Sequence, residues 1–353
     1  MKKFIQINPS LKQRNLDEMV RYIKRIGKGH KYDSILGLSG GVDSTYMAYF
    51  AKKLGLRPLA VHFDNGWNSE LAVKNIENIV TKLGIDLQTY VINWQEFKEI
   101  QLAYMRASVV DIEVPTDQLI FAALNKIASQ NGIKFILSGA NIVTEYGMPE
   151  DWAYRRKLDQ VNLLNIYKRF GKGDKLETLP KFGYYQQYYY SKIRGIQTLS
   201  LLNYTEYNKA HVKELIAQEL DWRDYGGKHY ESIFTRFYQG YILPNKFGID
   251  KRKAHLSALI CSGQITRSQA LQELQYNAYS LEQQEADKEF VLKKFDLSVS
   301  DFESIMKATR MEHDDYGTED IGDLKHQIFN LVMWLPAKAM DYWRRIITKL
   351  KNL

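Results

Sequence analysis

The chain has 353 residues, 45% of them hydrophobic and 25% charged, with a formal net charge of +8 at pH 7. These values exclude a disordered chain and allow a full core plus a second lobe. The single cysteine, Cys261, excludes an internal disulfide framework and a multi-cysteine zinc site, and fits a reducing compartment. Without a secretion signal or a run of about 20 apolar residues, we expect a cytoplasmic protein.

Residues 31–140 alternate short apolar runs with helical patterns. Because strands that alternate with helices form parallel sheets covered on both faces, we predict an α/β fold with a doubly wound parallel sheet of the Rossmann-like type. The predicted strands are Ile35–Leu38, Pro58–Phe63, Leu87–Ile92 and Lys134–Leu137, with helices at Ser44–Leu54, Ser69–Leu83 and, as a long pair, Trp94–Ser129.

From about residue 150 the sequence becomes richer in charged and aromatic residues, with one further strand predicted at Ile196–Leu202. We therefore divide the chain into an N-terminal helical extension at 1–30, an α/β domain at 31–205 and a mainly helical substrate or partner lobe at 206–353. The tyrosine-rich segment Phe182–Tyr190 lacks the interleaved basic residues of a nucleic-acid stacking surface. Packing or contact with a sugar is the interpretation we favour there.

The loop after the first predicted strand is Ser39-Gly40-Gly41-Val42-Asp43-Ser44. Two glycines let the backbone approach a ligand, and the N–H groups of the new helix point at bound anions. A carboxylate beside polyphosphate requires a divalent cation between them, so Asp43 is the predicted Mg²⁺ ligand. The alternative for these six residues alone is a turn followed by a helix cap.

The Ser-Gly-Gly-x-Asp-Ser pattern resembles the PP-loop of the ATP pyrophosphatase superfamily, whose members cleave ATP between the α- and β-phosphates. The resemblance implies that 31–205 is a PP-loop ATP pyrophosphatase domain and that ATP and Mg²⁺ are its cofactors. It assigns pyrophosphate binding to Ser39, Gly40, Gly41, Val42, Asp43 and Ser44.

Two further polar loops, Asp64–Trp67 and Ser138–Glu145, follow the second and fourth predicted strands. Since the carboxyl ends of parallel strands meet at one sheet edge, these loops should form a pocket with the first one. Asp64 either begins a turn with Asn65 and Gly66 or contacts the nucleotide or metal. We add His62, Asp64, Ser138 and Gly139 to the predicted ATP-binding residues, and Asn141, Glu145 and Arg155 to the predicted substrate-binding residues.

In the second lobe, residues 221–232 place Gly226-Gly227 beside Lys228, His229 and Glu231. This composition indicates a loop that brings charged side chains to a ligand, and it fits equally a helix cap with a hydrogen-bonded histidine. Further along, basic residues open a helix with apolar later turns, where Cys261 is predicted to be a small core residue.

Three blocks together resemble one family: SGGVDS with VHFDNGWNSELAVKNIENI, then LSGAN, then WRDYGGKHYES, TRFYQGYILP and DKRKAHLSALICSGQIT. They are similar to the N-acetyl sugar amidotransferases of surface-polysaccharide and flagellar-glycan synthesis, from about residue 20 to about residue 275. Members convert an acetamido group of a sugar into an acetamidino group with ATP and ammonia from a glutaminase partner. Many relatives begin with a cysteine-rich segment, which this chain lacks.

The resemblance implies that the amide oxygen attacks the α-phosphate of ATP and that ammonia then displaces AMP. Asp43, Lys228, His229 and Glu231 are the predicted catalytic residues, with His229 or Glu231 taking the proton that ammonia loses. Arg236 is a predicted substrate-binding residue. The implied partners are a separate glutaminase subunit, with a cyclase-like companion, and an acidic amino-sugar substrate; no nucleic acid is expected.

Two other functions remain open from the sequence. Superfamily members that thiolate or lysidinylate tRNA share the loop pattern, and a non-catalytic scaffold for a glutaminase is the third interpretation. The segment 330–353 is basic and amphipathic and bears tryptophan. It predicts a structural or interfacial helix that packs on its own protein or on a homodimer mate; the alternative is a helix that docks on a partner subunit or peripherally on the inner face of a membrane.

Overall fold

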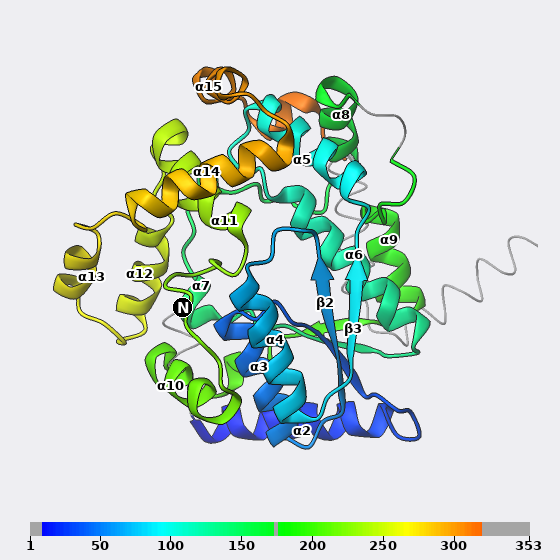
Figure 1. Ribbon diagram of the computed structural model, residues 1–353. Coiled ribbons are helices and arrows are strands. Elements are labelled where there is room, and N and C mark those ends of the chain that lie inside the picture. Colours follow the sequence, from blue (N-terminus) through cyan, green and yellow to red (C-terminus); the bar gives the residue numbers. More distant parts are fainter. Residues whose placement is uncertain (1–8, 173–175, 320–353) are drawn as a thin grey trace, which may run out of the picture.

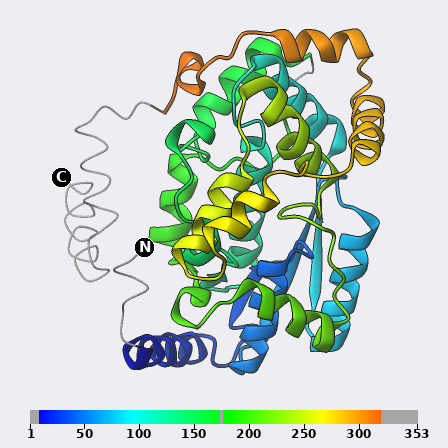
Figure 2. The same cartoon turned by 90° about the vertical axis from the view of Figure 1, so that its left-hand side faces the viewer.

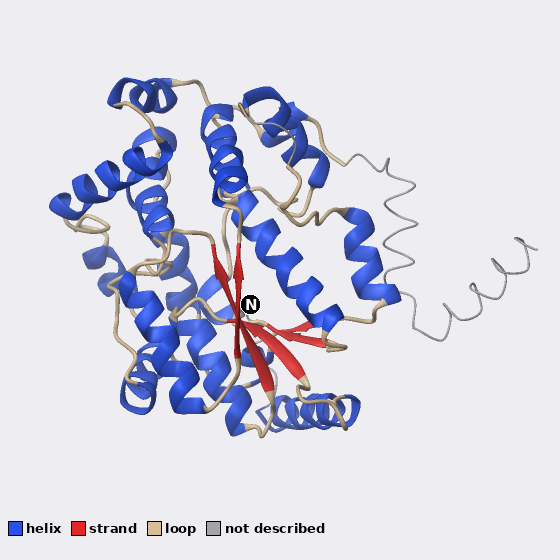
Figure 3. Ribbon diagram, turned by 45° about the vertical axis from the view of Figure 1, so that its right-hand side comes forward, coloured by secondary structure: helices blue, strands red, loops and turns tan. Residues whose placement is uncertain are grey.

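The computed structural model describes residues 9–172 and 176–319. A sheet lies at its centre, with helices around it (Figure 3). The sheet has five parallel strands in the order β3-β2-β1-β4-β5. The strands are β1 (Ser34–Gly37), β2 (Pro58–Asp64), β3 (Leu87–Val91), β4 (Phe135–Leu137) and β5 (Gln197–Leu199). The predicted doubly wound parallel sheet is confirmed.

The fifth strand is shorter than the sequence pattern predicts. β5 ends at Leu199, and the 3-10 turn η3 (Leu201–Tyr204) takes up the remainder of the predicted strand. Leu201 and Leu202 are both fully buried in the cluster that also contains Leu16 of the N-terminal helix. Successive side chains of a strand point to opposite faces of the sheet, so a strand would place Leu201 and Leu202 on different faces. The 3-10 turn instead buries both side chains on the same side of the sheet.

Helices cover both faces of the sheet because its central strands are apolar on both sides. Leu36 of β1 belongs to one apolar cluster with α2 (Pro9–Ile26), α3 (Val42–Lys53), α4 (Glu70–Leu83) and α10 (Lys209–Leu220). Ile35, the preceding residue, belongs to the opposite cluster with α6 (Val114–Gln130). The short α9 (Tyr184–Tyr188) and π-helix η2 (Tyr189–Ile193) lie on the α6 side (Figure 1).

A second helical layer faces the carboxyl ends of the strands, toward which the arrowheads of β2 and β3 point (Figure 1). Trp67, fully buried, lies in its core and stacks on Phe234 at 5.1 Å between ring centroids. The layer contains α5 (Trp94–Ala107), α8 (Gln160–Phe170), α11 (Ile233–Phe237), η4 (Tyr238–Phe247), α14 (Leu281–Phe295), α15 (Val299–Lys307) and η5 (His313–Tyr316).

Four short elements complete the described fold: α7 (Ile142–Glu145), η1 (Glu150–Trp152), α12 (Arg252–Cys261) and α13 (Arg267–Glu273). In Figures 1 and 2, α2 lies at one end of the molecule and α15 at the other. None of the helices in the described part of the chain is long and apolar enough to cross a membrane.

One residue prediction is wrong: Cys261 is exposed, because it ends α12 and lies outside the apolar clusters. The amphipathic segment 330–353 lies outside the described residues, so its role stays a prediction. The three-part division of the chain also stays a prediction.

Candidate active site

A cavity of about 520 Å³ lies where the carboxyl ends of β1 and β2 face the second helical layer. The strand order reverses between β1 and β4, so the cavity lies beside the switch point at which open α/β sheets bind ligands. Five residues predicted from the sequence line the cavity: Ser39, His62, Glu145, His229 and Glu231.

The PP-loop connects β1 to α3 through a backbone that requires glycine. Gly40 has φ +79°, and a Cβ there would lie 2.7 Å from the carbonyl oxygen of Ala72. The hydroxyls of Ser39 and Ser44 lie 3.2 Å apart. Gly41, the N-cap of α3, has no side chain to cap the helix, so the N–H groups of Asp43 and Ser44 in its first turn stay available, whereas that of Val42 donates to the Tyr225 hydroxyl.

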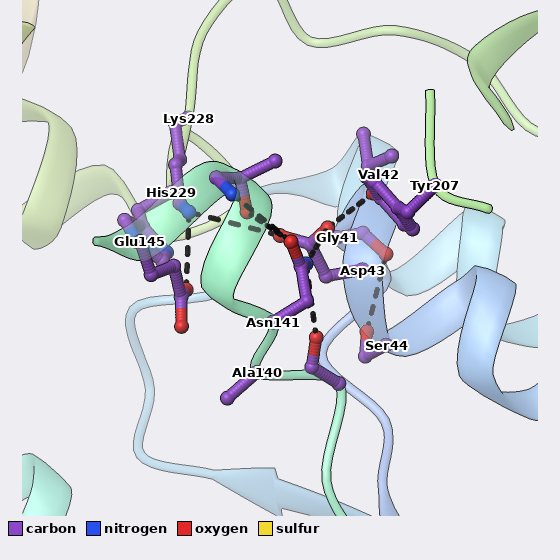
Figure 4. A network of polar contacts seen from close by, with 12 residues as sticks. Gly41, Val42, Asp43, Ser44, Ala140, Asn141, Glu145, Tyr207, Lys228 and His229 are labelled. Carbon is purple, nitrogen blue, oxygen red and sulfur yellow. Dashed lines mark hydrogen bonds and ion pairs between the residues drawn. The ribbon is translucent and has the colours of Figure 1, made fainter. Parts of the chain in front are cut away.

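Asp43 is the centre of a polar network next to the cavity (Figure 4). The Tyr207 hydroxyl donates a short hydrogen bond to its Oδ1, and Nδ2 of Asn141 donates to the same oxygen at 3.2 Å. Burial, followed by the charge of Asp43, raises the pKa of Tyr207, which keeps the hydroxyl protonated as a donor. Asp43 is thereby held in one orientation by two neutral donors.

Lys228 joins Asp43 to the wall of the cavity. Its Nζ lies 3.7 Å from Oδ2 of Asp43 and 3.0 Å from Oε1 of Glu145 (Figure 4). The lysine side chain is only 10% exposed, so this ion pair is shielded from solvent. The ammonium of Lys228, a predicted catalytic residue, therefore lies beside both Asp43, which is also predicted to be catalytic, and Glu145, which is predicted to bind substrate.

The loop after β4 packs directly against the start of α3. A Cβ on Gly139 would lie 3.0 Å from the backbone carbonyl carbon and oxygen of Asp43, so the two loops are in backbone contact. Asn141 caps α7 by accepting from the N–H of Thr144 at 3.0 Å, which fixes the amide that contacts Asp43. Ser138 accepts from the N–H of Ala140 and so shapes the same turn.

Glu231 lies over the PP-loop from the other side. Its Oε1 accepts from the Ser39 hydroxyl at 3.3 Å and lies 3.9 Å from Nδ1 of His229, whereas its buried Oε2 has no hydrogen-bond partner. Burial opposes ionisation of Glu231, but the hydrogen bond and charge of His229 outweigh it and lower the pKa of the carboxyl. His229 has φ +65°, a strained conformation for a residue with a side chain.

His62 also reaches the cavity from β2. Its Nδ1 donates to the carbonyl oxygen of Leu38 at 3.1 Å, since that oxygen can only accept, and its Nε2 accepts from Nδ2 of Asn68 at 3.1 Å. The ring is thus a neutral link between β1 and the loop after β2.

Sequence reasoning missed three aromatic residues that hold the segments on either side of α10 against the PP-loop. Tyr207 contacts Asp43 as described, Trp222 donates from Nε1 to the carbonyl oxygen of Gly40 at 2.8 Å, and the Tyr225 hydroxyl accepts from the N–H of Val42 at 3.1 Å. Trp222 and Tyr225 stand in the Gly-Gly block that the sequence did single out. Nothing in the sequence around Tyr207 marks it.

Three predicted site residues join neither the cavity nor the polar network around Asp43 and the PP-loop. Arg155 pairs with Glu150, and Arg236 makes two hydrogen bonds of 2.7 Å to Asp287. Asp64 accepts from the N–H of Gly66 at 2.9 Å, as expected for a residue that begins a turn and not for one that contacts the nucleotide or metal. The geometry gives no support to a binding role for these three side chains.

The arrangement fits ATP and Mg²⁺. The apolar wall formed by Leu38, Val61, Ile120, Ala123 and Leu124 suits a purine base. The described residues contain no group of three histidine, cysteine or acidic ligands that could hold a metal. Mg²⁺, however, is commonly held by one or two carboxylates together with substrate phosphates, and Asp43 supplies such a carboxylate beside the loop.

Comparisons with known families match two separate segments of the chain. Residues 15–111 match the family described as NAD synthase. Residues 231–332 match the family described as LPS biosynthesis protein WbpG-like, C-terminal domain. The chain thus combines a domain of the PP-loop ATP pyrophosphatase type with a domain linked to LPS biosynthesis, and the first of these indicates an ATP-utilising enzyme.

Among curated proteins, the chain is similar to a tRNA(Ile)-lysidine synthase of Chlamydia pneumoniae, 36% identical over 64 residues that cover 18% of this chain and 20% of the relative. It is also similar to a probable tRNA sulfurtransferase of Lysinibacillus sphaericus, 29% identical over 119 residues that cover 32% and 29%. The chain therefore spans less than a third of the length of either relative.

Among solved structures, NMN synthetase from Francisella tularensis has a TM-score of 0.32 at 17% identity, covering 61% of this chain and 96% of that one. The U34-tRNA thiolase NcsA from Methanococcus maripaludis has a TM-score of 0.34 at 16% identity, covering 72% and 80%. Both scores are low, and the fold assignment rests on the sheet topology.

Proposed function

We propose that this chain is an ATP-dependent amidotransferase that converts an acetamido group of a sugar into an acetamidino group, with release of AMP and pyrophosphate. The observation that carries the proposal is the shared cavity: Ser39 of the PP-loop and Glu231 of the WbpG-like segment line it together. An ATP-cleaving loop and a domain linked to LPS biosynthesis thus face the same space, as a sugar-activating enzyme requires.

The reaction needs activation because the amide oxygen is a very poor leaving group. The amide oxygen attacks the α-phosphorus of ATP; the new P–O bond forms as the bond to the bridging α,β-oxygen breaks, and pyrophosphate leaves. Ammonia then adds to the imidate carbon and loses a proton, and AMP departs with the former amide oxygen. No covalent bond to the enzyme is required.

The PP-loop would hold the pyrophosphate that leaves. The first-turn N–H groups of Asp43 and Ser44 in α3 would donate to an anion at this position. The hydroxyls of Ser39 and Ser44, which here donate to Glu231 and to the carbonyl oxygen of Gly41, would turn to the anion when it binds. A Mg²⁺ ion held by Asp43 would neutralise negative charge on the phosphates. Lys228, already beside Asp43, adds a further positive charge at the same place.

The pair of Glu231 and His229 is placed to take the proton that ammonia loses. Glu231 has a buried oxygen without a partner, and both residues line the cavity. The lowered pKa keeps the carboxylate of Glu231 ionised, so it can attract an ammonium ion, and the imidazole of His229 beside it would accept the proton as the general base. We propose that the ammonia comes from a separate glutaminase subunit, with a cyclase-like companion, and that the acceptor is an acidic amino sugar.

Phosphorus NMR tests the proposal. The purified chain is incubated with ATP, Mg²⁺, ammonium and a panel of acetamido sugars that includes UDP-sugars, uronic acids and nonulosonic acids. We expect AMP and pyrophosphate in equal amounts with at least one sugar and only when ammonium is present. Formation of ADP and phosphate, or sugar-independent release of AMP at the full rate, would contradict it.

A second candidate, tRNA modification, is favoured by the two curated relatives. Those matches cover a minor part of the chain, and the match at residues 231–332 points to LPS biosynthesis instead. A thiolating enzyme that uses two cysteines cannot be built from Cys261 alone. The discriminating test replaces the sugars in the NMR assay with bulk tRNA plus lysine or a persulfide donor: AMP release that needs tRNA would favour this candidate.

A further inference from the structure

The carboxylate of Glu231 lies over the N-cap of α3, at the place where the PP-loop would bind a phosphate. A Cβ on Gly41, the N-cap residue, would lie 2.9 Å from Oε1 of Glu231. It would also lie 3.1 and 3.2 Å from the hydroxyl oxygens of Ser39 and Tyr225. Three side-chain oxygens thus crowd the space above Gly41, so a phosphate can reach it only if at least one of them moves.

Glu231 makes contacts of the kind that a bound phosphate would make. Its Oε1 accepts from the Ser39 hydroxyl at 3.3 Å, and the same hydroxyl accepts from the N–H of Gly41 at 3.2 Å. Burial opposes ionisation of Glu231, but the neighbouring His229 outweighs that effect and lowers the pKa of the carboxyl. Negative charge at the N-terminus of a helix is stabilising, so the carboxylate is an internal anion at the phosphate position of the loop.

The carboxylate of Glu231 is only partly satisfied in this position. Its side chain is 13% exposed, and its Oε2 is buried without a hydrogen-bond partner among the residues that the structure describes. Nδ1 of His229 lies 3.9 Å from Oε1, which is too far for a strong hydrogen bond. A buried charge with so few close partners is costly, so a phosphate at this place would displace a weakly held group.

The backbone at Glu231 is anchored, so the side chain alone would leave the loop. The carbonyl oxygen of Glu231 accepts from the N–H of Ser69 at 2.9 Å, and the N–H of Ile233 donates to the carbonyl oxygen of Trp67 at 2.8 Å. These two bonds tie the segment to the loop after β2, next to an antiparallel bridge. The cavity of about 520 Å³, which Glu231 and His229 both line, has room for the rotated carboxylate.

We propose that the Glu231 carboxylate and the pyrophosphate part of ATP compete for one place on the PP-loop, and that ATP turns the carboxylate away from Ser39 into the cavity, where it completes the ammonium site beside His229. Side-chain rotation of one residue then couples the two steps of the reaction, because ammonium is bound well only after ATP has taken the loop. The ammonium part rests on the proposed function, whereas the competition on the loop does not.

Calorimetric titration of the full chain with inorganic pyrophosphate and Mg²⁺ measures the competition. Glu231→Gln removes the charge and keeps the size of the side chain. Glu231→Asp keeps the charge but shortens the side chain by one methylene group, so that it no longer reaches Ser39. The matched control is Glu70→Gln, which removes an exposed carboxylate from the first turn of α4, the helix whose backbone packs against Gly40.

We expect Glu231→Gln to bind pyrophosphate about 10-fold more tightly than the parent, Glu231→Asp to bind it more tightly by a smaller factor, and Glu70→Gln to leave the affinity unchanged. In steady-state assays with the acceptor sugar, Glu231→Gln should also raise the KM for ammonium, because a neutral amide attracts the cation less. A purely structural role of Glu231 would weaken both interactions, so opposite changes identify the exchange.

Equal or weaker pyrophosphate binding in Glu231→Gln would overturn the inference; weaker binding is what a carboxylate that holds Mg²⁺ against the phosphates would give. Tighter binding in Glu231→Gln but not in Glu231→Asp would also overturn it, since general repulsion between like charges then suffices. Should Glu231→Gln fail to fold, Glu231→Asp against the parent decides. Tighter pyrophosphate binding without amidination of any sugar would contradict the proposed function alone, whereas amidination with unchanged pyrophosphate affinity in both variants would contradict this inference alone.

Discussion

The indole N–H of Trp222 donates a hydrogen bond of 2.8 Å to the carbonyl oxygen of Gly40, in the middle of the PP-loop. Trp222 is only 3% exposed, so this carbonyl depends on the indole for its buried hydrogen bond. The same segment is bound to α4, because Asn75 exchanges hydrogen bonds of 2.8 and 2.9 Å with the backbone of Arg223. The segment that follows α10 thus holds the phosphate-binding loop in shape.

Trp222→Phe should therefore weaken both the fold and ATP binding. The ring is largely kept, but a buried carbonyl loses its partner, which costs about 1–3 kcal/mol of unfolding free energy. We expect the KM for ATP to rise more than kcat falls. Urea unfolding and steady-state kinetics measure the two effects, with Trp152→Phe, for which no indole hydrogen bond occurs in the described structure, as the control. An unchanged KM for ATP in a destabilised variant would show that the bond serves stability only.

Asp43→Asn should leave the chain folded and reduce pyrophosphate release about 10²- to 10³-fold. Asparagine keeps the size of the side chain and an acceptor for Tyr207 and Asn141, but it loses the charge that would hold Mg²⁺. The measurement is pyrophosphate release together with a thermal unfolding curve, and Asp86→Asn, at an exposed site, is the control. Pyrophosphate release at the parent rate by the folded variant would remove Asp43 from the mechanism.

Stability should fall in mild acid because of His255. Burial first, then the positive charge of Lys228, lowers the pKa of His255 to about 3. Unfolded histidine has a pKa of about 6.5, so between pH 6.5 and pH 3 the unfolded state binds a proton that the folded state does not. The stability contributed by the neutral ring is complete above pH 6.5 and is lost as the pH falls through this window.

His255→Asn should abolish about 2 kcal/mol of the decrease in unfolding free energy between pH 6.5 and pH 4.5. Urea unfolding at both pH values measures this, and His30→Asn, at an exposed position, should leave the decrease as it is in the parent. An identical decrease in the parent and in His255→Asn would mean that the folded histidine titrates normally. His313, whose pKa burial lowers to about 4, should add to the decrease in all three chains.

The purified chain should use ammonium but not glutamine as the nitrogen donor. A cysteine-dependent glutaminase needs an activated thiol beside a histidine base, and the one cysteine is exposed at the end of α12, outside the cavity. Turnover with ammonium should be unaffected by Cys261→Ser. Amidination with glutamine by the single purified chain, lost in Cys261→Ser, would refute the need for a separate subunit.

The sequence predicts the sheet and the PP-loop well because their signals are local. Pro58–Phe63 is apolar except for His62, as a central parallel strand requires, and it forms β2 with one further residue. The glycines of the loop are demanded by backbone geometry that can be recognised without tertiary structure. Lys228, His229 and Glu231 were likewise found because they flank a Gly-Gly pair.

The remainder of the site depends on contacts between distant segments, for which the sequence carries no local signal. Glu113 begins α6, Gln239 lies in η4 and Lys251 precedes α12, and only the packing of these helices brings them to one cavity. Arg236 illustrates the converse, since it stands among apparent site residues yet pairs with Asp287 of α14. Charge alone does not tell a ligand-binding arginine from a structural one.

The most direct test of the central claim follows the oxygen of the acetamido group. An acetamido sugar that supports AMP formation is labelled with ¹⁸O at the amide oxygen and turned over with ATP, Mg²⁺ and ammonium, and the products are analysed by mass spectrometry. If the amide oxygen attacks the α-phosphate, AMP gains one ¹⁸O, pyrophosphate gains none and the amidine product retains none. Label that remains in the sugar, or appears in pyrophosphate, would contradict the account.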